Sequence, residues 1–518
     1  MLVLLVLVVA LPILGAAVAL MLRDRMTHYL AAGVSLLTAA AAGWAILRVF
    51  PGSSHYLFGG MPWIWGSERQ QNLFGVFIDP LSSLMLIVIT SIGVLVTIYS
   101  SEYLSPRNRE HPSTEGYQRY YFWLLLFIGA MAGIAISPNL LQLFIFWELT
   151  TLCSWALISH YQEGPALRAG FKALIMTHVG GIFYLVGLFI LFIFTKSFDF
   201  AALGSPALST AMRSFVFFLF LVAAWAKAAQ IPFHTWLPDA MEAPTPISAY
   251  LHAAAMVKAG VYLIARIAMA SWAVSETMGL LVAGMALLTM FMALMFYFLQ
   301  DDLKKLLAYS TIAHLAYVLL GVSLGILGSR VGFQGGILHI ITHGFGKSTL
   351  FLTAGAIAYA TGTRKISGLG GIARALPIET AAFFIGAFTV TGVPPFGCFW
   401  SKFMIFTGAM GVPGPVGPII LVLALSESVI SFAWFLRIGQ KVFFGPPSKL
   451  VGKDLTDGDF KSPSITIGND EKPGEALPTG AGVKDPPPAI DWVLIVLMIC
   501  CLAAPLIGIP IVNALALP

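Results

Sequence analysis

Apolar runs separated by short polar connections cover almost the whole chain. A helix needs about 20 apolar residues to cross a hydrocarbon core of about 30 Å. Runs of this length begin near fourteen positions: 1, 28, 78, 120, 138, 169, 213, 246, 276, 305, 333, 378, 415 and 490. The pattern predicts an all-α polytopic membrane protein with about fourteen transmembrane helices.

A weak internal repeat organises the middle of the chain. At a shift of about 162 to 171 residues, Met176-Thr177-His178 matches Ile341-Thr342-His343, and Ile231-Pro232-Phe233 matches Pro394-Pro395-Phe396. Each copy would span five helices, and an odd number makes the second copy enter the membrane from the opposite side. The sequence therefore predicts two inverted five-helix repeats.

Five segments follow from the runs and the repeat. The first apolar run has no basic stretch before it and no convincing cleavage site before Arg23, so we expect a retained helix and no signal peptide. The predicted segments are a three-helix segment (1–119), a first repeat (120–270), a second repeat (271–444), a polar cytoplasmic loop (445–490) and a last helix (491–518).

Composition and charge agree with a membrane location. Hydrophobic residues make up 58% of the chain, charged residues 10%, and the mean hydropathy is +0.87. Lys and Arg are more frequent in the odd-numbered connections, which the positive-inside rule assigns to the cytoplasm. We therefore expect a multi-pass protein of the cell membrane with both termini on the outer side, and the net charge of +5 predicts no nucleic-acid partner.

The four cysteines show no C-x-x-C spacing and lie in or near apolar runs. This pattern supports neither an iron–sulfur cluster nor a disulfide framework. We expect no cofactor in this chain, so any redox chemistry would belong to another subunit.

Charged residues inside the apolar runs are the strongest functional signal. Each costs about 2.5 to 3.5 kcal/mol at the centre of a membrane helix, and such residues usually mark an ion pathway. They are Lys172, Lys227, Lys258, Lys347, Lys402, Glu148 and Glu427.

Prolines predict that two of the membrane helices are broken. Pro232 in the seventh span and Pro394-Pro395 in the twelfth remove backbone donors and clash with the preceding turn. Lys227 precedes the first break and Lys402 follows the second. An ammonium group there can hold or release a proton as its surroundings change.

Glu148 is the expected carboxylate partner of Lys227 within the first repeat. Closing and opening this pair would load and release a proton, whereas a static structural salt bridge is the alternative. Glu427 would pair with Lys402, serve an exit path, or act as an interfacial anchor.

Histidines extend the predicted proton relay, because histidine titrates near neutral pH. His252 and Lys258 are expected nearly two turns apart on one helix. His339, His343 and Lys347 share one helical stripe at a spacing of four. His178 and His314 are either relay members or hydrogen-bonded core residues.

A zinc or haem site at His339 and His343 is disfavoured, because no carboxylate supports it and Lys347 would repel a cation.

Three stretches together resemble the antiporter-like subunits of respiratory complex I, of Mrp sodium/proton antiporters and of membrane-bound hydrogenases. They are Phe146-Trp147-Glu148, the run from Ala226 to Pro246 (AKAAQIPFHTWLPDAMEAPTP), and the run from His252 to Tyr262. The resemblance covers roughly residues 70–440.

This resemblance implies a fourteen-helix ion-translocating subunit with a hydrophilic central axis. Matched residue by residue, it assigns the glutamate–lysine pair to Glu148 and Lys227, the connecting lysine to Lys258, a relay histidine to His343 and the terminal lysine to Lys402. It also implies partner membrane subunits, either homologous antiporter-like or small ones, and transport of protons or exchange of protons for sodium. The complex would be an ion-pumping oxidoreductase or an Mrp-type antiporter.

Two other functions stay open at this stage. The chain could be a non-pumping scaffold whose polar axis is vestigial, or a stand-alone secondary transporter for an organic solute. Unchanged pumping after substitution of Lys258 or Lys402 would favour the scaffold, and solute binding without partners would favour the transporter.

Overall fold

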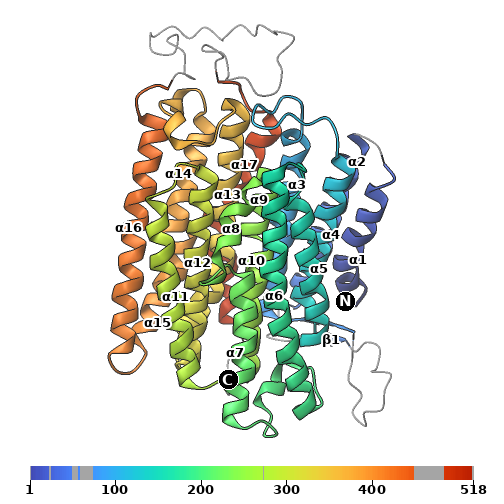
Figure 1. Cartoon of the computed structure of the whole chain (residues 1–518), viewed down its shortest axis with the longest axis vertical. Helices are drawn as coiled ribbons and strands as arrows, with labels where there is room; N and C mark the ends of the chain where they lie inside the picture. Colours follow the sequence, from blue (N-terminus) through green and yellow to red (C-terminus); the bar gives the residue numbers. More distant parts are fainter. Residues whose placement is uncertain are drawn as a thin grey trace.

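Long helices run roughly parallel to one another through the whole molecule (Figure 1). The computed structural model describes residues 2–22, 25–49, 56–58, 74–271, 274–448 and 483–515. Its helices are α1 (Leu2–Ala19), α2 (Arg25–Val49), α3 (Pro80–Tyr103), α4 (Tyr117–Ile136), α5 (Leu140–Ile158), α6 (Gly164–Thr195), α7 (Thr210–Lys227), α8 (Trp236–Asp239), α9 (Thr245–Ala253), α10 (Met256–Ser271), α11 (Glu276–Tyr297), α12 (Leu303–Ile326), α13 (Arg330–Thr361), α14 (Pro377–Thr391), α15 (Gly397–Met410), α16 (Val416–Phe444) and α17 (Pro488–Asn513).

The prediction of a polytopic helical membrane protein is confirmed. In the described part of the chain, 12 helices are long and apolar enough to cross a membrane, with α9 and α10 counted as one. The two remaining predicted spans are α13, which has 32 residues but many polar ones, and the interrupted pair α14 and α15. The inverted relation of the two repeats stays a prediction.

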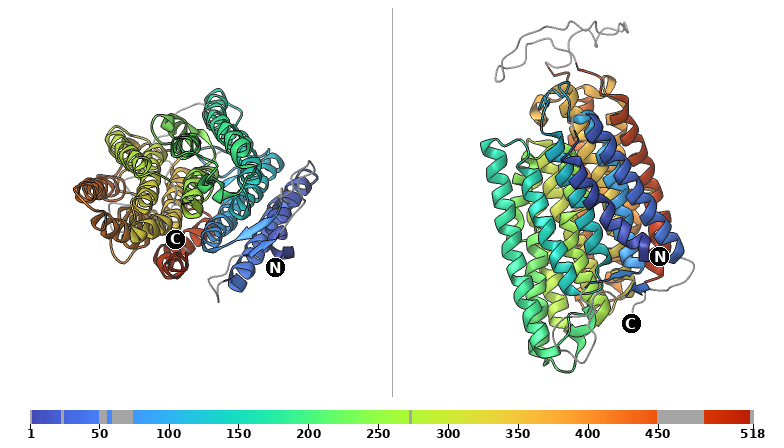
Figure 2. Two further views of the ribbon diagram at one scale, coloured as in Figure 1. Left: turned by 90° about the horizontal axis from the view of Figure 1, so that it is seen from below. Right: turned by 90° about the vertical axis from the view of Figure 1, so that its right-hand side faces the viewer.

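Both termini lie at the lower end of the bundle as drawn in Figures 1 and 2. We call the opposite end, where α3 is connected to α4, the upper face. The end of α16 and the start of α17 also lie there, so the polar segment is attached to this face. Most of that predicted loop, 449–482, lies outside the described residues.

A short strand pair was not predicted. β1 (Tyr56–Phe58) pairs antiparallel with β2 (Val76–Ile78), just before α3. Each strand has three residues, which is too short for a period-two pattern to stand out from the neighbouring apolar runs.

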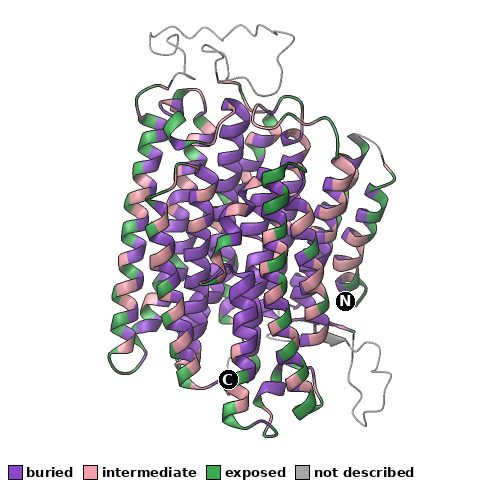
Figure 3. Ribbon diagram, in the orientation of Figure 1, coloured by how far each residue is buried: buried purple, intermediate pink, exposed green. Residues whose placement is uncertain are grey.

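Burial increases towards the centre of the bundle (Figure 3). The membrane-spanning window of α12 is 94% buried, whereas that of α16, at the edge opposite α1 and α2 in Figure 2, is 33% buried. Every residue of α13 from Gly332 to Thr361 is buried. This central position lets α13 contain polar groups that lipid would not tolerate.

The two helix breaks expected from the prolines are present. α7 ends at Lys227, and irregular backbone with the short helix α8 follows up to α9; α14 ends at Thr391, and five residues separate it from α15. A third break, between Ala253 and Met256, separates α9 from α10. His252 and Lys258 therefore do not share a continuous helix, contrary to our expectation, because the chain unwinds between them without a proline to signal it.

A buried ion pair fastens α10 to the start of α3. The Arg266 guanidinium donates to both carboxylate oxygens of Asp79, at 2.5 and 3.0 Å, and to the Tyr262 hydroxyl oxygen at 2.7 Å. Asp79 also caps α3 by accepting from the Ser82 amide at 2.8 Å. Both charges are thus paired and hydrogen-bonded, which is the condition for burying them.

Replacing Arg266 by methionine should destabilise the fold by about 3 to 5 kcal/mol, because Asp79 would become a buried, unpaired charge. Its counterpart in the predicted repeat, Arg437, is exposed and stacks on Trp434, so Arg437→Met is the matched control. Unfolding by SDS titration in detergent micelles measures both effects. Equal stabilities of the two variants would contradict the assignment.

Candidate functional site

Lys227, the last residue of α7, is fully buried against α5. Its ammonium donates to the Trp147 carbonyl oxygen at 2.6 Å and to the Thr151 hydroxyl oxygen at 2.8 Å, and lies 4.6 Å from the Trp147 ring centroid. All of these direct partners are uncharged. The helix break thus leaves an ammonium group inside the bundle with no carboxylate in contact.

Glu148 contacts a histidine and makes no ion pair with Lys227. Its Oε2 atom lies 2.8 Å from His178 Nδ1, and its buried Oε1 atom has no hydrogen-bond partner in the described part of the chain. Glu148 still interacts with Lys227 electrostatically. The direct pair that we expected is not formed, because the ammonium is already bound by a carbonyl and a hydroxyl and His178 reaches the carboxylate from α6.

Gly181 on α6 makes room for this carboxylate. A Cβ atom at Gly181 would lie 2.1 Å from Glu148 Oε1, and its other close neighbours also belong to Glu148. Any larger residue must therefore displace the carboxylate. We call Lys227, Trp147, Thr151, Glu148 and His178 the first lysine group.

Lys402, on α15 after the second break, repeats this arrangement. Its ammonium donates to the Ser428 hydroxyl at 2.8 Å and to the Thr391 carbonyl at 3.3 Å, and lies 4.6 Å from the Tyr317 ring centroid. Glu427 is buried and accepts from the Tyr317 hydroxyl at 2.7 Å. It acts on Lys402 electrostatically without forming an ion pair in direct contact. These five residues are the second lysine group.

Three buried histidines lie between α12 and α13. His314 Nδ1 is 3.0 Å from His339 Nε2, and His339 Nδ1 is 2.8 Å from the Ser401 hydroxyl, one residue before Lys402. The His343 ring centroid lies 5.0 Å from that of His314, and neither His343 nitrogen has a hydrogen-bond partner among the described residues. The predicted stripe on α13 is confirmed, and His314 joins it from α12. We call this the histidine cluster.

Lys258 lies beside the third helix break and faces the histidine cluster. It is fully buried, its ammonium donates to the Ile340 carbonyl at 2.6 Å, and it interacts electrostatically with His343. A Cβ atom at Gly344 would lie 2.6 Å from its Nζ atom, so this glycine provides the space for the ammonium.

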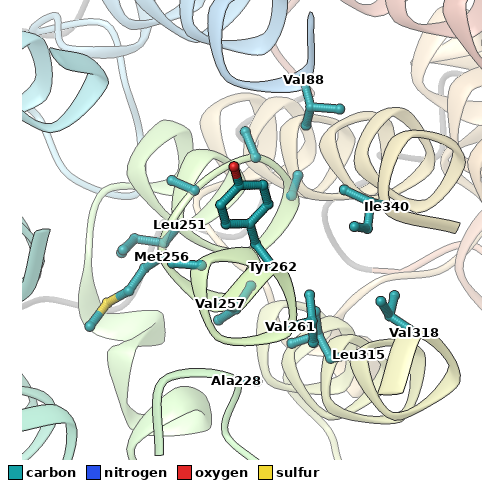
Figure 4. Packing of buried hydrophobic residues seen from close by; sticks show 14 of the residues in the cluster. Val88, Ala228, Leu251, Met256, Val257, Val261, Tyr262, Leu315, Val318 and Ile340 are labelled. Atoms are coloured by element: carbon teal, nitrogen blue, oxygen red, sulfur yellow. The ribbon is translucent and has the colours of Figure 1, made fainter. Parts of the chain in front are cut away.

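Apolar side chains surround the backbone near Lys258. Figure 4 shows this packing, with residues of α3, α9, α10, α12 and α13 and the residue after α7; the labelled ones are Val88, Ala228, Leu251, Met256, Val257, Val261, Tyr262, Leu315, Val318 and Ile340. Among the described residues no hydrogen bond joins the first lysine group to Lys258 or to the histidine cluster. Within the part of the chain that the structure describes, the predicted axis therefore consists of two polar regions with apolar side chains packed between them.

Lys347 and His252 form a branch that leads towards the upper face. The Lys347 ammonium donates to the Ser310 hydroxyl and to the Leu307 carbonyl. His252 is fully buried, neither of its nitrogens has a described hydrogen-bond partner, and it interacts electrostatically with Lys347 and Lys304. Lys172 is not part of this interior, because it is partly exposed and pairs with Asp239 at 2.7 Å.

The sequence model of the NADH:quinone oxidoreductase/Mrp antiporter transmembrane family matches residues 137–431. This range contains both lysine groups and the histidine cluster. The chain belongs to this family. A second model, the N-terminus of chain 5 of NADH-ubiquinone oxidoreductase (complex I), matches residues 63–121.

Curated family members are clearly similar in sequence. Subunit 5 of the chloroplast NAD(P)H-quinone oxidoreductase of Chara vulgaris is 39% identical over 69% of this chain and 54% of its own length. One of the Na(+)/H(+) antiporter subunits of Alkalihalophilus pseudofirmus is 38% identical over 72% of this chain and 48% of its own. The chain thus spans about half the length of these relatives.

Solved structures show the same fold. A chain of the Mrp complex from Dietzia sp. superimposes on 99% of this chain and 51% of its own length, with a TM-score of 0.80 and 28% identity. A chain of the membrane-bound sulfane sulfur reductase, an archaeal respiratory membrane complex, covers 99% of this chain and 96% of its own at a TM-score of 0.79. At 23% identity the second match shows the fold alone.

Sequence reasoning missed a charged network at the upper face of this family member. Arg364 pairs with Asp302 at 2.6 Å, Glu110 at 3.4 Å and Glu242 at 3.5 Å. Lys304, which we assigned to a cytoplasmic connection, is buried beneath this network and donates to the Ala243 carbonyl at 2.8 Å. Its position at the start of an apolar run resembles that of a loop cation, so only the tertiary structure distinguishes the two.

Glu110 in this network gives a pH dependence that can be measured. Burial alone would raise the pKa of its carboxyl, but the positive charges of Lys304 and Arg364 outweigh burial and lower the pKa below 4.5. Because the folded state has the lower pKa, the ionised carboxylate stabilises the fold above pH 4.5, and this contribution is lost as the pH falls further.

Glu110→Gln should therefore lower the free energy of unfolding at pH 7 by on the order of 1 kcal/mol, and by much less at pH 3.5. Glu115→Gln is the control, because Glu115 lies in the same connection but is exposed. Thermal unfolding in detergent at the two pH values tests this. A deficit in Glu110→Gln that does not depend on pH would contradict the assignment.

Proposed function

We propose that this chain translocates protons, alone or in exchange for sodium, as an antiporter-like subunit of a multi-subunit membrane complex. One observation supports this most strongly. Two lysines next to helix breaks are buried with uncharged direct partners, while a glutamate acts on each electrostatically without a direct ion pair. A stable fold has no need of this arrangement, because buried ammonium groups are costly without a contacting counterion.

The separated glutamate gives each lysine two states. When Glu148 moves towards Lys227, the charged ammonium is favoured; when it turns to His178, the ammonium has only neutral partners. The unpartnered Oε1 atom of Glu148 and the small residue Gly181 are consistent with a carboxylate that changes position. The second lysine group would work in the same way through Glu427.

A pathway through the centre follows from the contacts. Protons would pass from the upper face along Lys304, His252 and Lys347 to the histidine cluster, and on to Lys402. Lys258 would connect the histidine cluster to the first lysine group. The apolar side chains shown in Figure 4 would have to move apart at the break between α9 and α10 for protons to pass between Lys258 and the first lysine group.

The assembly and its location are part of the proposal. Relatives and structural neighbours bear the names of quinone oxidoreductase, Mrp and respiratory membrane complexes, which supports membrane subunits as partners that drive the transport. The distribution of Lys and Arg favours the cell membrane with both termini outside.

A non-pumping scaffold is the second candidate, and the apolar packing near Lys258 favours it. In a scaffold the polar groups would never exchange protons, and substitutions that preserve assembly would leave transport unchanged. The following comparison of glycine variants distinguishes the two functions.

Gly181→Ala should reduce proton transport by about tenfold or more, because the added Cβ atom displaces the Glu148 carboxylate. The displaced group is the end of a flexible side chain, so the fold should hardly be affected. Gly284→Ala on α11 is the matched control, since a Cβ atom there has no neighbour within 4 Å. Transport is measured with a pH-sensitive dye in inverted vesicles containing the native complex.

Lys227→Ala provides an independent test of the same group and should abolish transport. Assembly is followed by native gel electrophoresis in every case. Transport near the wild-type rate in both Gly181→Ala and Lys227→Ala, with intact assembly, would refute the proposed function. The non-pumping scaffold would then be the remaining candidate.

A further inference from the structure

Two carboxyl groups face each other at the upper face, away from both lysine groups. Glu379 lies in the first turn of α14 and Asp491 in the first turn of α17, and their side chains are within hydrogen-bonding reach. Glu379 is only 2% exposed, and both its Oε1 atom and Asp491 Oδ1 are buried without a hydrogen-bond partner among the described residues. Asp491 is partly accessible to water.

Two ionised carboxylates are both acceptors and cannot hydrogen-bond to each other. Among the described residues, no lysine or arginine is a main electrostatic neighbour of either group; the other acid nearby, Asp485, increases the repulsion, and Tyr99 of α3 is uncharged. A proton on one of the two carboxyls satisfies both the hydrogen bond and the charge.

We propose that Glu379 and Asp491 form a proton-binding acid pair that is loaded from water at Asp491. A divalent metal ion fits less well, because it takes six or more oxygen ligands or keeps several waters. Among the described residues no group of three or more acidic, histidine or cysteine side chains gathers there. Glu379 lies on α14, the first half of the broken helix whose second half, α15, holds Lys402.

Two tyrosines together interact with this pair and with the network around Arg364. Tyr99 interacts electrostatically with Glu379 and with Glu110. Its ring stacks on that of Tyr103 at 5.7 Å, and the Tyr103 hydroxyl donates to Glu110 at 3.0 Å. The acid pair thus lies at one end of a polar belt below the upper face, and its role in proton uptake rests on the proposed function.

Labelling with dicyclohexylcarbodiimide tests the bound proton, because this reagent reacts with protonated carboxyl groups in apolar surroundings. The native complex in membranes is labelled between pH 5 and 9, and modified peptides are quantified by mass spectrometry. We expect strong labelling of Glu379 at pH 7 and little of Glu276, which lies in the first turn of α11 but is exposed.

The variant Asp491→Asn shows whether the proton is shared. Its amide can donate to an ionised Glu379, so the pH at which labelling is half-maximal should fall by at least about one unit. An unchanged midpoint, or labelling of Glu379 no stronger than that of Glu276, would overturn the proposal. Protection of Glu379 by sodium ions at constant pH would also overturn it, because the pair would then bind a metal cation.

A transport measurement tests the uptake role separately. Glu379→Gln can still hydrogen-bond to Asp491 but cannot store a proton, so proton uptake should slow by about tenfold, while Glu276→Gln transports normally. Unchanged proton uptake in Glu379→Gln would overturn the role of the acid pair in transport, whereas proton binding by the pair would still be judged by the labelling experiment. Labelling needs no transport, so its outcome is independent of whether the proposed function holds.

Discussion

Burial of ammonium groups inside an apolar helix bundle is the constraint on which the rest of this structure depends. A lysine in the membrane interior is tolerated only if uncompensated charge is avoided, either by hydrogen bonds to the ammonium or by loss of its proton. Lys227, Lys258, Lys347 and Lys402 all use backbone carbonyl oxygens for this purpose. Each carbonyl is a strong but neutral partner, so the lysine remains able to change its charge.

The irregular backbone meets this need at Lys402. The last carbonyl groups of a helix have no partner within the helix, whereas the carbonyls of Trp147, Ile340 and Leu307 lie inside α5, α13 and α12 and accept from a lysine there. Thr391 at the end of α14 provides its carbonyl to Lys402, and α7 ends at Lys227 itself. The two lysine groups share a pattern: a hydroxyl and a carbonyl oxygen accept from the ammonium, an aromatic ring centroid lies 4.6 Å away, and a glutamate interacts with the lysine electrostatically. Similar physical demands in the two halves explain this common pattern.

The sequence predicted most of the fold, because membrane helices are signalled by length and hydropathy alone. Prolines located two of the helix breaks correctly. The third was missed because Ala254 and Ala255 are good helix formers, and only tertiary packing unwinds the chain there. The contact between Glu148 and His178 was not predicted, since the reach of His178 from α6 depends on helix packing. Lys304 looked like a loop residue because its burial, too, depends on how the helices pack.

The central claim is that the buried lysines exchange protons during transport, and Lys258 tests it most directly because it connects the two polar regions. Lys258→Met removes the proton-binding group but keeps the side-chain length, and Lys441→Met on the exposed side of α16 is its control. We predict that initial proton flux in vesicles containing the native complex falls at least about tenfold in Lys258→Met and is unchanged in Lys441→Met. Equal fluxes in the two variants, at equal assembly, would contradict the claim.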